Sequence, residues 1–163
     1  MGRTGSLWAY QQGPVRPDLI TTAKALGGGL PAGACVTSPE HGDVLAAGDH
    51  GSTFAGGPLV ASAALAALDA TDDPELLRAV REMGARLHEG VAALDGVREV
   101  RGRGLMVGVG LEDGLDSTEI AGRLLEAGLV VNAPEPATLR LLPPLVVGKA
   151  EIDEAVGRLA GAL

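Results

Sequence analysis

One run of apolar residues with helical spacing constrains the fold of this chain more than any other feature. Its members step by three or four positions and so share one helix face: Leu76, Val80, Met83, Leu87, Val91 and Leu94. Asp73 and Pro74 suit the N-cap and the first helical position, and Gly96 suits the end. The pattern predicts a helix of about twenty residues whose apolar face other elements must cover.

The residues after this helix alternate between short apolar segments and helical patterns. We expect helices at about 117–127 and 150–163, and strands at Val97–Arg101, Leu105–Leu111, Leu129–Val131 and Leu139–Leu142. Asp116 with Glu119 resembles a capping pair, and Gly128 suits the position just after a helix. Residues 73–163 are therefore expected to form a compact α+β unit with a core of its own.

The first 57 residues show a different pattern, with one strand and two glycine-rich loops. Leu19–Ala23 is typical of a short buried strand, and Lys24 follows it directly. Three consecutive glycines at 27–29 favour a loop in which the backbone approaches another group closely. A second loop at 50–58 leads into an expected helix over 58–69.

A single strand cannot form a sheet, and a parallel strand must be covered on both faces. Residues 1–57 are therefore expected to be the end of a larger domain, in which the Lys24 strand lacks its neighbours. By the same argument, we expect Met1 to be an internal methionine of a longer protein.

Composition excludes several classes of partner. The net charge of −8 argues against a nucleic-acid surface, and only three aromatic residues could stack on bases: Trp8, Tyr10 and Phe54. The longest apolar stretches are too short to span a bilayer. The single cysteine, Cys35, and the lack of a basic, then apolar, leader favour a cytoplasmic location.

Lys24 is the first candidate for chemistry, because open α/β sheets bind ligands at the carboxyl ends of their strands. Only two of the thirteen Lys and Arg residues are lysines, Lys24 and Lys149. Desolvation at a strand end would favour the neutral amine that Schiff-base chemistry needs. A solvated surface lysine remains the alternative.

Two further segments could bind anions. Gly51-Ser52-Thr53 offers backbone N–H groups and two hydroxyls ahead of a helix N-terminus, which suits a phosphate, although such turns also serve as plain connectors. Arg140 lies in a leucine-rich strand, where it could bind a carboxylate or simply point outward. The three histidines show no metal-ligand spacing, so no metal site is expected.

Four segments together resemble the C-terminal part of class III pyridoxal-phosphate aminotransferases. Residues 17–31, with Lys24 before the three glycines, resemble the segment of the Schiff-base lysine. Residues 50–54 resemble the loop that reaches the neighbouring subunit's cofactor phosphate, and residues 139–145 resemble the strand of the substrate-carboxylate arginine. Met1–Gly5 with Trp8-Ala9-Tyr10 resembles the stretch after the family's Asp-Glu-Val-Gln motif.

The resemblance implies an α/β fold: the C-terminal portion of a PLP-dependent transferase of fold type I. Residues 1–57 would close the large cofactor domain, 58–72 would form an interdomain helix, and 73–163 would form the small α+β domain. Val130–Ala133 before the Arg140 strand is most similar to acetylornithine aminotransferases. The implied reaction transfers an amino group from N2-acetylornithine to 2-oxoglutarate in arginine biosynthesis.

The resemblance also implies roles for individual residues. Lys24 would be the catalytic and cofactor-binding lysine, Thr53 would bind the cofactor phosphate of the other subunit of a homodimer, Ser52 would lie beside the substrate, and Arg140 would bind its carboxylate. Ala25, Ala55 and Gly57 depart from the family's usual residues. A methyl group at residue 25 or 55 is tolerable only where φ is negative.

The sequence leaves three functions open. The first is the aminotransferase just described, with this chain inactive or nearly so by itself because the family's remaining cofactor-binding residues lie upstream. The second is an aminotransferase of the same class acting on ornithine, succinylornithine or 4-aminobutyrate. The third is a non-catalytic remnant that binds a full-length homologue.

Overall fold

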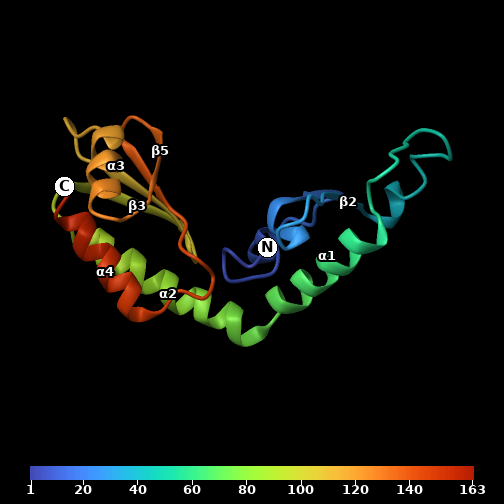
Figure 1. The fold of residues 1–163 in the computed structure, drawn as a ribbon, viewed down its shortest axis with the longest axis horizontal. Coiled ribbons are helices and arrows are strands. Elements are labelled where there is room, and N and C mark those ends of the chain that lie inside the picture. Colours follow the sequence, from blue (N-terminus) through green and yellow to red (C-terminus); the bar gives the residue numbers. More distant parts are fainter. The chain divides into compact units, whose positions relative to one another are not determined.

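The computed structural model describes residues 1–163, which divide into two compact units. Unit 1 comprises Met1 and Ser6–Asp73, and unit 2 comprises Gly2–Gly5 and Pro74–Leu163. Figure 1 labels the α-helices and some of the strands. None of the helices is long and apolar enough to cross a lipid bilayer.

Unit 2 is built on a four-stranded antiparallel sheet. Its strands lie in the order β3-β4-β6-β5, with the bounds β3 Val97–Arg103, β4 Met106–Leu111, β5 Asn132–Glu135 and β6 Thr138–Leu141. Three helices complete the unit: α2 Pro74–Ala92, α3 Ser117–Glu126 and α4 Lys149–Ala160.

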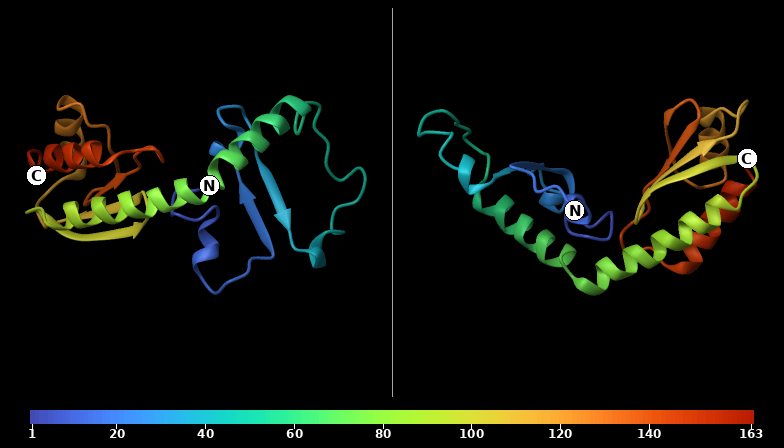
Figure 2. Two further views of the ribbon diagram at one scale, coloured as in Figure 1. Left: turned by 90° about the horizontal axis from the view of Figure 1, so that it is seen from below. Right: turned by 180° about the vertical axis from the view of Figure 1, so that it is seen from behind.

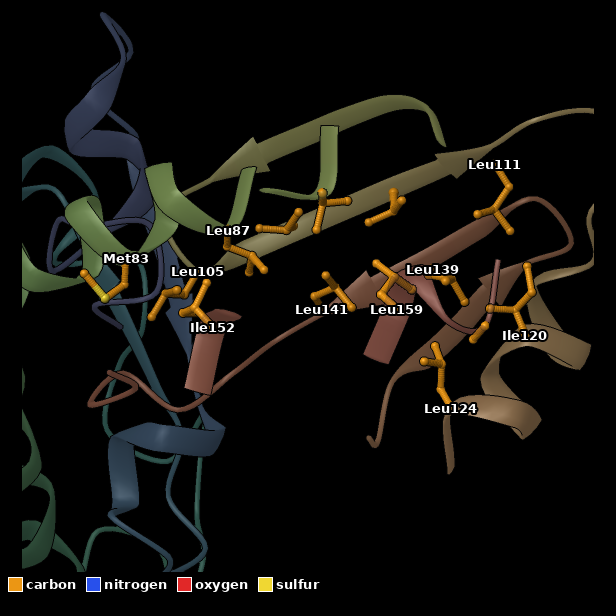
Figure 3. Packing of buried hydrophobic residues seen from close by; sticks show 14 of the residues in the cluster. Met83, Leu87, Leu105, Leu111, Ile120, Leu124, Leu139, Leu141, Ile152 and Leu159 are labelled. Atoms are coloured by element: carbon orange, nitrogen blue, oxygen red, sulfur yellow. The ribbon is translucent and has the colours of Figure 1, made fainter. Parts of the chain in front are cut away.

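One face of this sheet carries the core of unit 2. The inward positions of β4 and β6 pack with the apolar sides of all three helices, as Figure 3 shows for the larger side chains. Fully buried members include Val80, Leu87, Val91, Leu105, Val107, Val109, Leu111, Ile120, Leu124, Leu139, Ile152 and Leu159. Gly2–Gly5 and Pro74–Leu163 therefore form a compact α+β unit with a core of its own.

The helices of unit 2 lie where the sequence predicts them, but two of them end earlier than expected. Helix α2 contains the periodic run from Leu76 to Val91 and ends at Ala92, before Leu94 and Gly96, and α4 ends at Ala160 instead of continuing to residue 163. The carboxylate of Asp116 accepts hydrogen bonds from the N–H groups of Thr118 and Glu119, at 2.8 and 3.0 Å, and so caps α3. Gly128 has a φ of +79°, as its place after the helix requires.

The predicted strand at Leu129–Val131 is wrong, because α3 ends there in a way that uses the strand's donors. The N–H of Leu129 donates to the carbonyl of Leu124 at 2.8 Å, and that of Gly128 donates to Leu125 at 3.0 Å. These two bonds form a Schellman motif. Strand β5 therefore starts later, at Asn132.

The peptide Gly2–Gly5 is bound to unit 2 at three places. The carbonyl of Arg3 accepts a hydrogen bond from the N–H of Leu105 at 2.9 Å. The guanidinium of Arg3 donates to the carbonyl of Pro143, and that of Arg81 donates to the carbonyl of Gly5. Partial burial lowers the pKa of Arg3 below its usual value. This peptide thus joins α2, the turn before β4 and the segment after β6.

Unit 1 holds a two-stranded antiparallel sheet and one long helix. Its elements are β1 Leu19–Thr22, β2 Ala34–Thr37 and α1 Pro58–Thr71, with 3-10 turns η1 Ala9–Gln12, η2 Lys24–Gly27 and η3 Pro39–His41. Figure 2 shows the opposite directions of the two strands. The expectation that the Lys24 strand lacks a neighbour is therefore wrong: β1 pairs with β2, whose residues follow the glycine loop.

The strand before Lys24 is also not buried as expected. Leu19 is 57% exposed, and on the neighbouring strand Val36 is 54% exposed. Helix α1 has no buried residue along its length. The one buried hydrophobic side chain of unit 1 is Leu26, so this unit leaves most of its apolar surface uncovered.

Adjacent leucines on α3 test where the core of unit 2 lies. Leu124 is fully buried, whereas Leu125 is 61% exposed. We expect Leu124→Ala to lower the free energy of unfolding of unit 2 by about 3 kcal/mol. Leu125→Ala, the matched control, should change it by less than about 0.5 kcal/mol. Native-state hydrogen exchange of the β4 and β6 amides measures both, and equal effects would contradict the described core.

Candidate functional site

Lys24 has an unusual backbone conformation at the end of β1. Its φ is +54°, and it is the only residue other than glycine with positive φ in the structure. A left-handed conformation costs a residue with a side chain about 1–2 kcal/mol, and such strain is concentrated at functional sites. The Lys24 side chain is exposed and has no hydrogen bond or ion pair. The structure therefore presents an unpaired amine on a strained backbone.

The glycines that follow Lys24 allow the close approach that their sequence predicts. An added Cβ at Gly27 would lie 3.0 Å from the Cβ of Ala32. Gly28, with φ +59°, packs on α1, where an added Cβ would lie 3.6 Å from the Cβ of Ala67. The turn after Lys24 is thus held between the following loop and α1.

The Gly51-Ser52-Thr53 segment lies in the loop before α1, with all three residues exposed. The hydroxyl of Ser52 accepts a hydrogen bond from the N–H of Ala55 at 3.2 Å. The hydroxyl of Thr53 has no partner within the chain. This leaves Thr53 available to an anion, while Ser52 shapes the turn.

The backbone is not strained at the two positions where alanine replaces a glycine of the family. Ala25 and Ala55 are absent from the residues with positive φ. Gly57 has a φ of −63° and is the N-cap of α1, before Pro58. The backbone at all three positions therefore accepts a side chain, so the methyl groups of Ala25 and Ala55 cause no backbone strain.

Arg140 lies on the face of the sheet opposite the core. Its neighbours Leu139 and Leu141 point into the core of unit 2, so strand alternation turns Arg140 outward. Gly108 on β4 pairs with both Arg140 on β6 and Arg101 on β3. The two arginines therefore lie on the same face of the sheet. Between them is β4, where Gly108 has no side chain to separate them.

A recess of about 480 Å³ opens on this face of unit 2. It is lined by Thr4, Arg101, Gly102, Arg103, Met106, Val107, Gly108, Pro134, Glu135, Thr138 and Arg140. Arg101 is held there by three partners: Glu99 at 2.6 Å, the Thr138 hydroxyl at 3.3 Å and Glu135 at 4.0 Å. Arg140 is exposed and takes part in no ion pair. An unpaired guanidinium in a recess is a suitable site for a carboxylate.

The four residues predicted from sequence fall into two groups. Lys24, Ser52 and Thr53 belong to unit 1, and Arg140 belongs to unit 2. The structure shows no hydrogen bond between Lys24 and the Ser52–Thr53 loop. No three His, Cys, Asp or Glu side chains are placed to share a metal ion.

Sequence reasoning missed Arg101 and Glu135 as parts of the recess. The sequence feature that could have indicated them is the pair of glycines at alternate positions of β4, Gly108 and Gly110. These glycines leave room for long side chains from a neighbouring strand.

The strain at Lys24 can be tested with two variants that both remove the amine. Glycine adopts positive φ freely, whereas alanine does not. The N–H groups of Leu26 and Gly28 are hydrogen-bonded across this turn, at 3.2 and 3.1 Å. We expect both amides to exchange with solvent about fivefold more slowly in Lys24→Gly than in Lys24→Ala, equivalent to about 1 kcal/mol. Equal rates would contradict the strained conformation.

Comparisons with known proteins show which family the chain resembles. The sequence profile of the class III aminotransferases matches residues 1–163. Acetylornithine aminotransferase 1 of Bordetella bronchiseptica is 43% identical over 160 residues, covering 96% of this chain and 40% of the relative. Acetylornithine aminotransferase of Mycobacterium tuberculosis is 41% identical over 165 residues, covering 100% of this chain and 41% of the relative.

Solved structures show the same relationship in three dimensions. N-acetylornithine aminotransferase of Stenotrophomonas maltophilia superposes with a TM-score of 0.86 at 34% identity, covering 99% of this chain and 43% of the other. Ornithine δ-aminotransferase of Plasmodium falciparum gives 0.87 at 33% identity, covering 99% and 43%. The chain spans about two fifths of the length of the curated relatives it matches, and it belongs to the class III aminotransferase family.

Proposed function

We propose that this chain supplies the catalytic lysine and the small domain of a pyridoxal-phosphate-dependent aminotransferase. The observation that carries the proposal is Lys24: an unpaired amine, on the chain's one strained side-chain-bearing residue, between a strand end and a glycine turn. The family to which the chain belongs supports this interpretation. In this proposal residues 1–57 form the C-terminal end of the cofactor domain. Residues 58–72 form the helix that connects this domain to the small domain, which comprises residues 73–163.

The residues of unit 1 fit the cofactor by the chemistry of their side chains. The aldehyde of pyridoxal 5′-phosphate needs a free amine, which Lys24 offers, and its phosphate needs hydroxyl and N–H donors, which Thr53 and its loop offer. When bound, the cofactor supplies the electron sink for bonds at the carbon that bears the amine. Lys24 would hold the cofactor through its amine, and Lys24 Nζ would also be the group that accepts and returns a proton at the substrate carbon.

Thr53 acts, in this proposal, on a cofactor held by a partner subunit. Its hydroxyl has no partner within the chain and its loop is exposed, which suits a residue completed by a second copy in a homodimer. Ser52, whose hydroxyl holds the turn through Ala55, lies beside the substrate.

Arg140 binds a carboxylate of the amino-acid or 2-oxo-acid substrate. Its unpaired guanidinium stands in a recess with three arginines and one glutamate among its lining residues, so the recess attracts anions in a chain that is otherwise acidic.

We propose N2-acetylornithine and 2-oxoglutarate as the substrates. The curated relatives cited above are acetylornithine aminotransferases, which supports this choice. The similarity to an ornithine aminotransferase keeps ornithine as the alternative within the same class. Relative turnover of the two amines by a completed enzyme distinguishes them.

A non-catalytic role has support of a different kind. Unit 1 exposes Leu19, Val36, Phe54 and Leu59, a surface suited to burial against another polypeptide. Co-purification with an intact homologue, without cofactor on Lys24, would favour this second function.

The role of Lys24 is tested by reduction with borohydride in the presence of pyridoxal 5′-phosphate. Two proteins are compared: this chain alone, and a fusion in which it replaces the matching part of the Bordetella bronchiseptica relative. We expect a label on Lys24 in the fusion only. Lys24→Arg in the fusion should abolish the label and lower turnover about 10³-fold, whereas Lys149→Arg should change neither. A label on Lys149, or none in the fusion, would contradict the proposal.

The role of Arg140 is tested in the same fusion by steady-state kinetics. Because Arg140→Met removes a charged hydrogen-bond donor to a carboxylate, KM for 2-oxoglutarate should rise about 30- to 100-fold, equivalent to about 2–3 kcal/mol. Arg98→Met is the control, since Arg98 is a similarly exposed arginine that pairs with Asp113 instead. An unchanged KM in Arg140→Met would show that the carboxylate binds elsewhere.

A further inference from the structure

We propose that Arg101 is a positioning residue that keeps Glu135 away from Arg140, so that Arg140 remains open to a substrate carboxylate. This inference rests on the proposed role of Arg140. It starts from a contrast within one recess: Arg101 has three partners, whereas Arg140 has none.

The side chain of Arg101 lies flat over β4 toward the far strands. An added Cβ at Gly108 would lie 3.2 Å from Arg101 Cγ, and one at Gly110 would lie 2.7 Å from Glu99 Cγ. Both glycines therefore leave the space that these side chains occupy. Across it, the Arg101 guanidinium reaches the Thr138 hydroxyl on β6 and the Glu135 carboxylate on β5.

Glu135 is the carboxylate best placed to reach Arg140. It pairs with Thr138, which is two residues from Arg140 on the same face of β6. Such diagonal neighbours have Cα atoms about 7–8 Å apart, within reach of long side chains. The Thr138 hydroxyl lies 3.5 Å from Glu135 Oε2 and 3.3 Å from Arg101 Nη2. Thr138 thus links the two ions and holds Glu135 on the Arg101 side.

Without Arg101, Arg140 is the recess arginine on the strand adjacent to Glu135, since β5 pairs with β6, whereas Arg103 lies on β3 at the other edge of the sheet. A carboxylate of the chain would then compete with the carboxylate of the substrate for one guanidinium. Because the groups are exposed, the competition is modest. An exposed ion pair contributes up to about 1 kcal/mol. Pairing with Glu135 would therefore lower the fraction of Arg140 that is free to bind a carboxylate about three- to fivefold.

The test measures how fast phenylglyoxal modifies each arginine of the full 163-residue chain, by mass spectrometry of its peptides. A guanidinium paired with a carboxylate reacts more slowly than a free one. We expect Arg101→Met to slow modification of Arg140 about threefold, and the double variant Arg101→Met/Glu135→Gln to restore the original rate. Arg98→Met, which removes an arginine of equal exposure from the same strand, should leave Arg140 unchanged.

An unchanged rate at Arg140 in Arg101→Met, or slowing that Glu135→Gln does not reverse, would overturn the inference and leave the proposed function intact. A second arm adds 2-oxoglutarate to the fusion with the Bordetella bronchiseptica relative, where it should protect Arg140. Lack of protection there would overturn the proposed role of Arg140 itself, and with it the inference. In the fusion with Arg101→Met, about threefold more 2-oxoglutarate should be needed for the same protection.

Discussion

The alternation of side chains along β4 and β6 is the constraint on which unit 2 depends. Val107, Val109 and Leu139 face one side, where all three helices cover them. The same alternation turns Gly108 and Arg140 to the other side. A shift of one residue in register would bury the arginine and expose the leucines. The core that stabilises unit 2 therefore also fixes where Arg140 stands.

Unit 1 has no comparable constraint, and its site has a different physical basis. With one buried hydrophobic side chain, Leu26, its short sheet derives little stability from burial. Strain at Lys24 must nevertheless be offset by the surrounding structure. Packing of Gly28 on α1 and the hydrogen bonds across the turn contribute. The exposed faces of β1, β2 and α1 add little to this support.

Much of unit 2 could be predicted because its signals are local. The periodicity of α2, the cap at Asp116 and the glycine after α3 each depend on a few neighbouring residues. The strand expected at Leu129–Val131 failed for a reason that hydropathy does not show, since the donor of Leu129 closes α3. Likewise, the pairing of β1 with β2 joins a recognisable strand to one with a weak apolar pattern, Ala34–Thr37.

The candidate site was predictable only in part. Lys24 and Arg140 stand out because each interrupts an apolar or glycine-rich segment, which a single sequence displays. The partners of Arg101 come from three strands, β3, β6 and β5, and only the sheet order brings them together. Sequence spacing shows that Thr138 and Arg140 share a face, but not that Glu135 lies opposite Thr138.

The glycines of β4 show how packing and chemistry are joined in this fold. Glycine weakens a strand, because it has more freedom to lose and no side chain to pack. On β4 the glycines lie only on the face opposite the core, so no core side chain is lost. Val107, Val109 and Leu111 fill the face that packs in the core. The space above Gly108 and Gly110 lets Arg101 and Glu99 cross β4. A larger residue at Gly110 would displace Glu99 from Arg101 and weaken the network at its first bond. The low side-chain volume of β4 on this face therefore allows Arg101 and Arg140 to share one recess, in which Arg101 is paired and Arg140 takes part in no ion pair.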